Sequence, residues 1–250
     1  MRNIYFLFFL FTCIPVNAQY SVQNAHSHND YRNKVPFWTA YNARFGSIEV
    51  DVFAVDGELF VAHTKCGVKR KRTLDDLYIK PLLLCYEENQ NKPWSDYDGE
   101  LQLLIELKTP ASPTLDLLVA KLAQYPKIFD RSVNPNAVQV VITGRRPHPS
   151  NFGLYPSFIM FDGHLFTAYT AEQLERIALY SDAWKMPKNR TLSAADHAKM
   201  KEMIDRAHKL NKKIRFWATK DTPKAWKMLM ELGVDFINTD KVNKLAEYLQ

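Results

Sequence analysis

SIEVDVFAVDGELFVAHT, residues 47–64, is the stretch from which the fold of this chain can be worked out. Its first half alternates apolar residues with Glu49 and Asp51, as expected for a β-strand that is buried on one face. Because side chains i and i+2 of a strand point the same way, the two carboxylates are predicted to share a face. The dipeptide Asp56-Gly57 then predicts a tight hairpin turn, which returns the chain toward the end of the strand where the carboxylates lie.

Strand-like runs alternate with helical patterns along the rest of the chain. Short apolar runs rich in β-branched and aromatic residues predict eight strands, most of them separated by segments with helical periodicity. This alternation favours a TIM (β/α)₈ barrel in a single domain. An open doubly wound sheet is the alternative, although no glycine-rich phosphate loop follows any strand. The predicted strands cover residues 20–25, 47–55, 101–108, 137–143, 157–161, 183–186, 213–218 and 235–238, and the predicted helices 37–45, 73–84, 112–125, 171–180, 193–210, 222–232 and 241–249.

The first eighteen residues differ from the rest of the chain. Arg2 precedes an apolar stretch over residues 4–16, and Ala18 provides a small residue at a cleavage site. We expect a signal peptide over residues 1–18 and a mature domain over residues 19–250, in a secreted or periplasmic protein. The alternative is an N-terminal membrane anchor, but the apolar stretch is shorter than the roughly 18 residues that span a bilayer. We expect no transmembrane segment in the mature chain.

The composition is that of an ordinary globular protein with a modest positive charge. Of the 250 residues, 46% are hydrophobic, and loss of the N-terminal segment leaves 32 Lys and Arg against 27 Asp and Glu, a net charge of +5. This surplus favours small anionic substrates or lipid headgroups and does not by itself indicate nucleic acid. Cys66 and Cys85 can form a disulfide in an oxidising compartment or stay as two buried free thiols, and both possibilities are open.

A third carboxylate is predicted to lie beside the first two. In the run LLIELKT, residues 103–109, Glu106 and Lys108 share one face at the end of a predicted strand. The carboxyl ends of barrel strands meet at one mouth, so Glu106 should approach Glu49 and Asp51. Three carboxylates within apolar strands repel one another unless a cation lies between them, and an all-oxygen set suits a hard cation. The sequence therefore predicts one divalent cation, Mg²⁺ or Ca²⁺.

Two histidines in the run HSHND, residues 26–30, fit two kinds of chemistry. As ligands of an amidohydrolase barrel, His26 and His28 would need further histidines after the fifth and sixth strands, but only His164 lies near those ends. His28 and His63 on either side of a metal instead fit acid–base cleavage of a phosphodiester. One histidine would deprotonate the attacking hydroxyl, and the other would protonate the leaving oxygen. His26 is then expected to have a structural or supporting part.

The order of these residues resembles that of the PLC-like phosphodiesterases, which include glycerophosphodiester phosphodiesterases and phosphatidylinositol-specific phospholipases C. In that superfamily a histidine near strand 1 is followed by E-x-D on strand 2, D-G and a second histidine, and a metal carboxylate with a nearby lysine on strand 3. The runs TLDDL, RFWATKD and LGVDFINTD also match, so the resemblance spans nearly the whole mature chain. Its main motifs are found here as His28, Glu49-Val50-Asp51, Asp56-Gly57, His63, Glu106 and Lys108.

The resemblance implies a role for each of these residues. The three carboxylates would hold one divalent cation, the two histidines would be the acid–base pair, and Lys108 would stabilise charge on the phosphate rather than only pair with Glu106. Glycerophosphodiesterases carry H-R-G where this chain has His28-Asn29-Asp30, which is closer to the phospholipase C pattern. Asn29 is therefore a candidate fourth metal ligand. The substrate implied is a glycerophosphodiester or a phospholipid headgroup, and this departure leaves the choice open.

Further residues at the predicted mouth are candidates for substrate binding. Arg145 and Arg146 follow the fourth strand, where guanidinium groups can hold an anionic headgroup, and Trp217 can form an apolar wall. A solvated loop and plain packing are the respective alternatives. The basic run KCGVKRKRT, residues 65–73, can steer an anionic substrate but lacks the interleaved aromatics of a nucleic-acid surface. The alternatives in function are a non-catalytic ligand-binding barrel and, with less support, a metal-dependent amidohydrolase.

Overall fold

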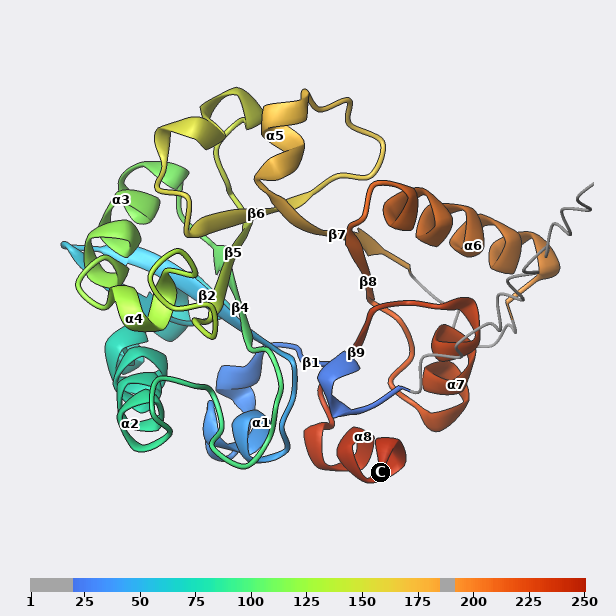
Figure 1. Cartoon of the computed structure of the whole chain (residues 1–250), viewed down its shortest axis with the longest axis horizontal. Helices are drawn as coiled ribbons and strands as arrows, with labels where there is room; N and C mark the ends of the chain where they lie inside the picture. Colours follow the sequence, from blue (N-terminus) through green and yellow to red (C-terminus); the bar gives the residue numbers. More distant parts are fainter. Residues whose placement is uncertain (1–19, 185–191) are drawn as a thin grey trace, which may run out of the picture.

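The computed structural model describes residues 20–184 and 192–250, which form a closed barrel of eight parallel strands (Figure 1). Parallel pairing runs from β1 through β9, β8, β7, β6, β5 and β4 to β2, and the pairing of β1 with β2 closes the ring. β3 lies outside the ring as an antiparallel partner of β2. The predicted TIM barrel is therefore confirmed. The strands are β1 (Ala25–Ser27), β2 (Ser47–Val55), β3 (Glu58–Val61), β4 (Gln102–Leu107), β5 (Gln139–Gly144), β6 (Ile159–Gly163), β7 (Ile177–Ala183), β8 (Lys213–Trp217) and β9 (Phe236–Thr239).

Helices surround the ring and connect most successive strands (Figure 1). Ser193 and Thr222 cap the N-termini of α6 and α7 with their side chains. Within the described residues, no helix is both long and apolar enough for a membrane span. The helices are α1 (Trp38–Asn42), α2 (Lys80–Glu88), α3 (Ala111–Leu122), α4 (Pro126–Phe129), α5 (Ala171–Glu175), α6 (Ala194–Lys209), α7 (Pro223–Leu232) and α8 (Val242–Leu249), with shorter turns η1 (Val22–Asn24), η2 (Asp30–Arg32), η3 (Lys65–Arg70), η4 (Asp75–Ile79) and η5 (Pro149–Leu154).

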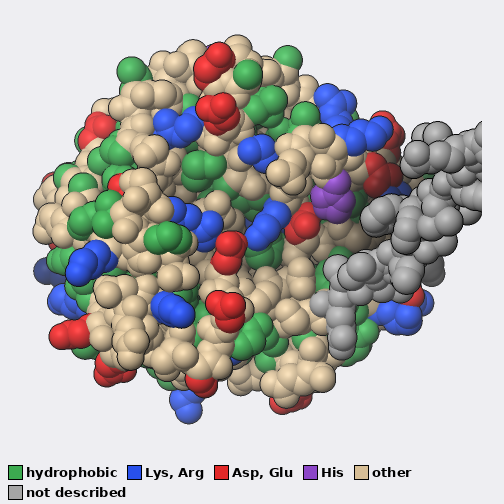
Figure 2. Space-filling model, in the orientation of Figure 1, with side chains coloured by type: hydrophobic (Ala, Val, Ile, Leu, Met, Phe, Trp, Pro, Cys, Tyr) green, Lys and Arg blue, Asp and Glu red, His purple; other side chains and the backbone are tan. Residues whose placement is uncertain are grey.

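Two sets of buried apolar side chains hold the barrel together. The larger set includes the outward-facing residues of the strands and the helix faces that cover them. A smaller set fills the inside of the ring and consists of Leu104, Val141, Leu179 and Phe236. Leu104 precedes Glu106 by two residues and shares its face of β4, so this apolar layer lies beneath the polar residues of the mouth. On the end of the barrel seen in Figure 2, acidic and basic side chains are interspersed.

Two predicted strands were placed wrongly. Residues 22–24 form the turn η1, because Ser21 and Asn24 bond reciprocally to backbone N–H groups, and the strand begins only at Ala25. The strand predicted at 183–186 is β7 at Ile177–Ala183, and the helix predicted over 171–180 ends at Glu175.

Tertiary burial decides the placement of β7, because Ile177 and Leu179 are enclosed between the neighbouring strands β6 and β8. An apolar run of this length fits a helix or a strand equally well by its local pattern. Residues 185 and 186 of the predicted strand, like the signal peptide predicted over 1–18, lie outside the described residues.

Of the two possibilities left open for Cys66 and Cys85, the disulfide is not formed. Cys66 and Cys85 are both free; Cys66 is exposed in η3, whereas Cys85 is buried in α2. The alternative of two buried thiols is therefore correct for Cys85 alone.

Candidate functional site

Three carboxylates converge at the carboxyl ends of β2 and β4. Glu49 and Asp51 leave the same face of β2, and Asp51 lies opposite Glu106 in the pairing with β4. One oxygen of each side chain lies within 4.8 Å of the others. Glu49 and Asp51 are buried, whereas Glu106 is partly exposed. The structure therefore brings together the three residues that the sequence predicts as metal ligands.

The two oxygens of Asp51 have different surroundings. Oδ2 lies 2.8 Å from the Tyr31 hydroxyl, 3.0 Å from Nδ1 of His63 and 3.1 Å from Nζ of Lys108. Oδ1 is buried and has no hydrogen-bond partner among the described residues. A buried carboxylate oxygen without a donor is costly, and a cation between the three carboxylates would satisfy it. The donor set thus fits a hard divalent cation.

Glu49 is held from behind by residues inside the barrel. Its Oε2 lies 2.7 Å from Nε2 of His26 and accepts a hydrogen bond from Arg215, while its Oε1 lies 3.9 Å from His28. Although burial opposes ionisation, Arg215 and His26 hold the pKa of Glu49 well below its usual range. Glu49 therefore stays ionised, with one oxygen left for a ligand.

His26 has the supporting part that the sequence suggests. Its ring is fully buried, and Nδ1 lies 2.7 Å from the Ser47 hydroxyl while Nε2 faces Glu49. Burial and the charge of Arg215 lower the pKa of His26 to about 3, so the ring is neutral. One nitrogen thus contacts Ser47 and the other Glu49. This leaves His26 no nitrogen for a metal, as the amidohydrolase arrangement would need.

His28 and His63 each lie against a carboxylate at the mouth. Nδ1 of His28 lies 2.8 Å from Asp240, the residue after β9, and Nδ1 of His63 lies 3.0 Å from Asp51. The type I′ turn at Asp56-Gly57, with φ of 49° and 78°, returns the chain so that His63 follows β3. Burial opposes protonation of His28, but the hydrogen bond to Asp240 and the charge of Glu49 raise its pKa. Each ring is therefore oriented through one nitrogen.

The hydroxyl of Tyr31 lies between Asn29, Asp51 and His63. Its hydroxyl lies 2.6 Å from Oδ1 of Asn29, 2.8 Å from Oδ2 of Asp51 and 3.3 Å from Nδ1 of His63. Asn29 has left-handed backbone angles, and its amide nitrogen lies 2.9 Å from His28. The side-chain oxygen of Asn29 is thereby placed beside the carboxylates, on the side of the two histidines.

Lys108 lies between two of the carboxylates. Its Nζ is 2.9 Å from Glu106 and 3.1 Å from Asp51, so it pairs with more than Glu106 alone. Burial works against the charged ammonium, but these carboxylates raise the pKa of Lys108 and keep it protonated. Burial and the charge of Asp51 raise the pKa of Glu106, which indicates that Lys108 does not offset all of the negative charge in the cluster.

The predicted substrate-binding residues differ in position. Trp217 is the last residue of β8 and shares a strand face with Arg215, whose side chain reaches Glu49. The side chain of Trp217 is half-exposed at the mouth of the barrel. Arg145 is exposed and its side chain forms no hydrogen bond or ion pair with the described site residues, whereas the charge of Arg146 acts on buried Asp162 inside the barrel. Arg146 is thus nearer the barrel interior than Arg145.

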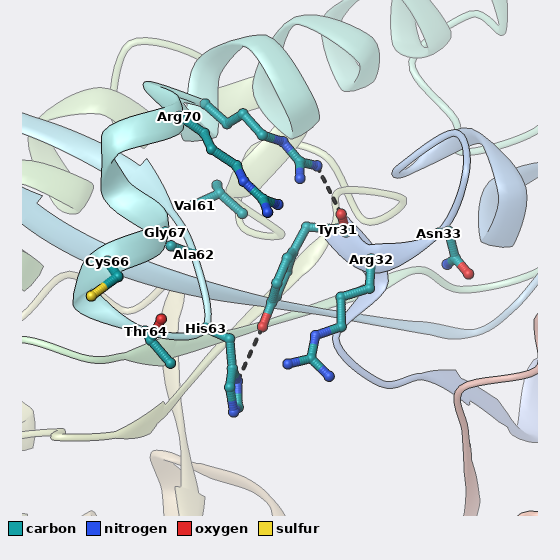
Figure 3. Close-up of a pocket in the computed structure, with 11 residues that line it drawn as sticks. Tyr31, Arg32, Asn33, Val61, Ala62, His63, Thr64, Cys66, Gly67 and Arg70 are labelled. Atoms are coloured by element: carbon teal, nitrogen blue, oxygen red, sulfur yellow. Dashed lines mark hydrogen bonds between the residues drawn. The ribbon is translucent and has the colours of Figure 1, made fainter.

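A cavity of about 570 Å³ opens beside His63 (Figure 3). Tyr31 forms one wall, and the chain from Val61 to Arg72 forms another. Figure 3 shows the Tyr31 hydroxyl directed at His63, with Arg32 extending toward the same region. The cavity is therefore continuous with the histidine side of the site.

Three residues of the site were missed from the sequence. Tyr31 follows the HSHND motif, but its contacts depend on how η2 folds back over β2. Asp240 and Arg215 lie in the runs LGVDFINTD and RFWATKD that carry the resemblance, yet their partners are 212 and 166 residues away. For Asp240 and Arg215, the only indication in the sequence was that they lie in motifs shared with the family, and these motifs did not assign them a role.

Comparison with known proteins places the chain among phosphodiesterases. Residues 16–151 match the AIM6-like phosphodiesterase domain, and residues 213–243 match the Glycerophosphoryl diester phosphodiesterase family. The chain is 27% identical over 263 residues to the Altered inheritance of mitochondria protein 6 homolog of Arthroderma benhamiae. The matched region covers 89% of this chain and 82% of that protein. The corresponding protein of Eremothecium gossypii is 25% identical over 268 residues, or 89% and 68%.

Solved structures with the same barrel include two bacterial proteins. A glycerophosphodiester phosphodiesterase from Parabacteroides distasonis matches with a TM-score of 0.56 and 15% identity over 90% of this chain and 96% of that one. A putative glycerophosphoryl diester phosphodiesterase from Silicibacter pomeroyi matches with a TM-score of 0.50 and 15% identity, over 91% and 90%. At this identity the likeness shows the shared fold.

Proposed function

The chain belongs to the AIM6-like phosphodiesterase family, and we propose that it is a metal-dependent phosphodiesterase that uses His28 and His63 as an acid–base pair. The substrate class is a glycerophosphodiester or a phospholipid headgroup phosphodiester. One observation carries this proposal: the converging carboxylates, with Oδ1 of Asp51 buried and unpartnered, lie between two histidines that are each oriented by a carboxylate. The family order of residues agrees with it.

The carboxylates and Asn29 are the residues that would hold one cation, Mg²⁺ or Ca²⁺. Such a cation supplies charge neutralisation for the phosphate oxygens when it is bound. Glu49 offers the oxygen that His26 and Arg215 leave free, and Asp51 offers Oδ1. Because all the donors are oxygens, a hard cation is favoured over zinc.

The histidines would move the two protons of the reaction. One imidazole takes the proton from the attacking hydroxyl as the new P–O bond forms, and the other gives a proton to the leaving oxygen as the old bond breaks. A hydroxyl of the substrate would give a cyclic phosphate, whereas water would give direct hydrolysis. Asp240 and Asp51 orient the two rings, and Lys108 would face the negative charge that develops on the phosphate.

A secreted or periplasmic location is part of the proposal and rests on the sequence of residues 1–18. The competing function is a barrel that binds a phosphodiester without cleaving it. The orientation of both histidines by carboxylates favours catalysis, since a binding site has no need of a prepared proton donor and acceptor.

Purified protein assayed against a panel of glycerophosphodiesters and headgroup phosphodiesters tests the proposal. We expect turnover with Mg²⁺ or Ca²⁺, loss of turnover with EDTA, and no turnover after Asp51→Asn. Binding of a phosphodiester without cleavage, under every metal condition, would favour the non-catalytic barrel. Hydrolysis of an amide substrate added to the panel, with no phosphodiester cleavage, would favour an amidohydrolase.

A further inference from the structure

We infer that the cavity beside His63 binds a second anionic group of the substrate, and that the preferred substrate carries a phosphomonoester in addition to the phosphodiester that is cleaved. This inference rests on the proposed function. The cavity of about 570 Å³ has the size of a small-molecule site and includes His63 in its lining. A group bound there would therefore be attached close to the scissile bond.

The lining is unusually rich in arginine. Arg32, Arg70 and Arg72 all contribute to it, and none of the described residues that line it is a carboxylate. Arginine presents a planar fork of donors that matches phosphate oxygens, so a cluster of three without a carboxylate favours an anion of this type. The interspersed charges of the face in Figure 2 give no such preference.

Two of these arginines form no ion pair with the residues that the structure describes. Arg72 donates a 2.8 Å hydrogen bond to the carbonyl of Tyr31, which fixes its side chain along the cavity wall. Neither Arg32 nor Arg70 forms an ion pair within residues 20–184 and 192–250, although the charge of Arg32 helps to lower the pKa of Asp240. Figure 3 shows Arg32 and Arg70 extending toward Tyr31 from different elements. Their guanidinium groups thus remain available to a ligand.

The cavity and the carboxylate cluster lie on different sides of Tyr31. Its hydroxyl contacts Asp51 and His63, and its backbone carbonyl is held by Arg72. The scissile phosphate is expected on the side of the carboxylates, where a bound cation would neutralise its charge. Without that cation, the three carboxylates would repel an anion. A second phosphate is suited to the arginine side. One substrate can occupy both places if its alcohol carries the additional phosphate.

Binding at the cavity can be measured without activity, because Cys66 is exposed in its lining while Cys85 is buried. The full chain is alkylated with the neutral reagent N-ethylmaleimide, and the modified cysteine is identified by mass spectrometry. We expect inorganic phosphate to slow alkylation of Cys66 saturably, relative to chloride at equal ionic strength. The Arg32→Gln/Arg70→Gln variant should lose this protection. Arg131→Gln, beside the amino ends of the strands at the other end of the barrel, should keep it. Unsaturable protection, or equal protection in the double variant, would overturn the site.

The substrate arm compares two phosphodiesters whose alcohols differ only by a phosphomonoester. We expect kcat/KM to be about tenfold higher or more for the phosphorylated one, as one or two charge-assisted hydrogen bonds imply, and equal for both in the double variant. Phosphate protection of Cys66 without this preference would mean a site for free phosphate and would reject the substrate assignment. Absence of turnover with both compounds, with protection intact, would reject the proposed function while leaving the anion site standing.

Discussion

The two carboxylate oxygens of Glu49 face different parts of the barrel. Oε2 accepts from His26 and Arg215 inside the barrel, and Oε1 faces the mouth. In Glu49→Gln, the amide oxygen would turn toward these two donors, which leaves the NH₂ group toward the cation site. We expect the metal concentration for half-maximal activity to rise about tenfold or more, with activity partly restored at high metal.

Metal titration of the activity measures this effect. Glu100→Gln, two residues before the start of β4 and exposed, serves as the control and should behave like the wild type. An unchanged metal dependence in Glu49→Gln would show that this carboxylate is not a ligand.

His28 and His63 are expected to contribute separately to catalysis. Each alanine variant should lose turnover by ~10²–10⁴-fold with little change in metal affinity, which is the usual scale of general acid–base catalysis. A substrate with a p-nitrophenolate leaving group should rescue the acid variant far more than the base variant, because that group needs little protonation. His197→Ala, exposed on α6, is the control. Equal rescue of both variants would contradict the division of roles.

The β2–β3 hairpin is the element that places His63. Gly57 has φ of 78°, a conformation that an L side chain adopts at a cost, although its Cβ would meet no atom within 4 Å. Gly57→Ala should therefore lower the free energy of unfolding by about 1 kcal/mol through the backbone alone. We also expect a lower kcat, because the end of β3 positions His63.

Urea unfolding and initial rates measure the two effects. Gly153→Ala is the matched control, since Gly153 also has open space around its Cβ but no left-handed φ. The idea fails if both variants lose the same stability and keep the same kcat.

At the scale of the whole molecule, the barrel interior changes from apolar to charged along its axis. The layer of Leu104, Val141, Leu179 and Phe236 is followed by buried ionisable groups, and Asp162 on β6 is one of them. Its Oδ1 has no partner among the described residues, while Oδ2 accepts from Thr143 at 2.9 Å. Burial raises the pKa of Asp162 despite the nearby Arg215.

This raised pKa predicts a pH-dependent stability. The folded protein keeps the proton of Asp162 at a pH where the unfolded chain has released it. The contribution of Asp162 to the free energy of unfolding therefore falls as the pH rises above about 4, which is the pKa of an aspartate in the unfolded chain. We expect Asp162→Asn to gain thermal stability relative to the wild type as pH rises through this range. Melting temperatures of Asp162→Asn and the wild type are measured in EDTA across this pH range, with exposed Asp116→Asn as the control. A difference in melting temperature that stays constant with pH would refute the prediction.

Local sequence pattern determined most of the fold and the centre of the site. Alternation within β2 and β4 places Glu49, Asp51, Glu106 and Lys108 on one face, because strand geometry depends only on the spacing of residues. The Asp56-Gly57 turn is local in the same way, since it needs only residues that accept positive φ. These features could be predicted without knowing any neighbour in space.

Only the tertiary structure decided how the site is supported and where two strands lie. Asp240 reaches His28 because β9 pairs with β1, and Arg215 on β8 reaches Glu49 because the pairing of β1 with β2 closes the ring. The limits of β7 follow from burial between β6 and β8, which overrides a local pattern that suits helix and strand alike. Cys66 and Cys85 stay apart because the fold exposes one thiol and buries the other. Spacing along the chain fixes which face a side chain takes, but the partner it meets across the barrel depends on closure of the whole sheet.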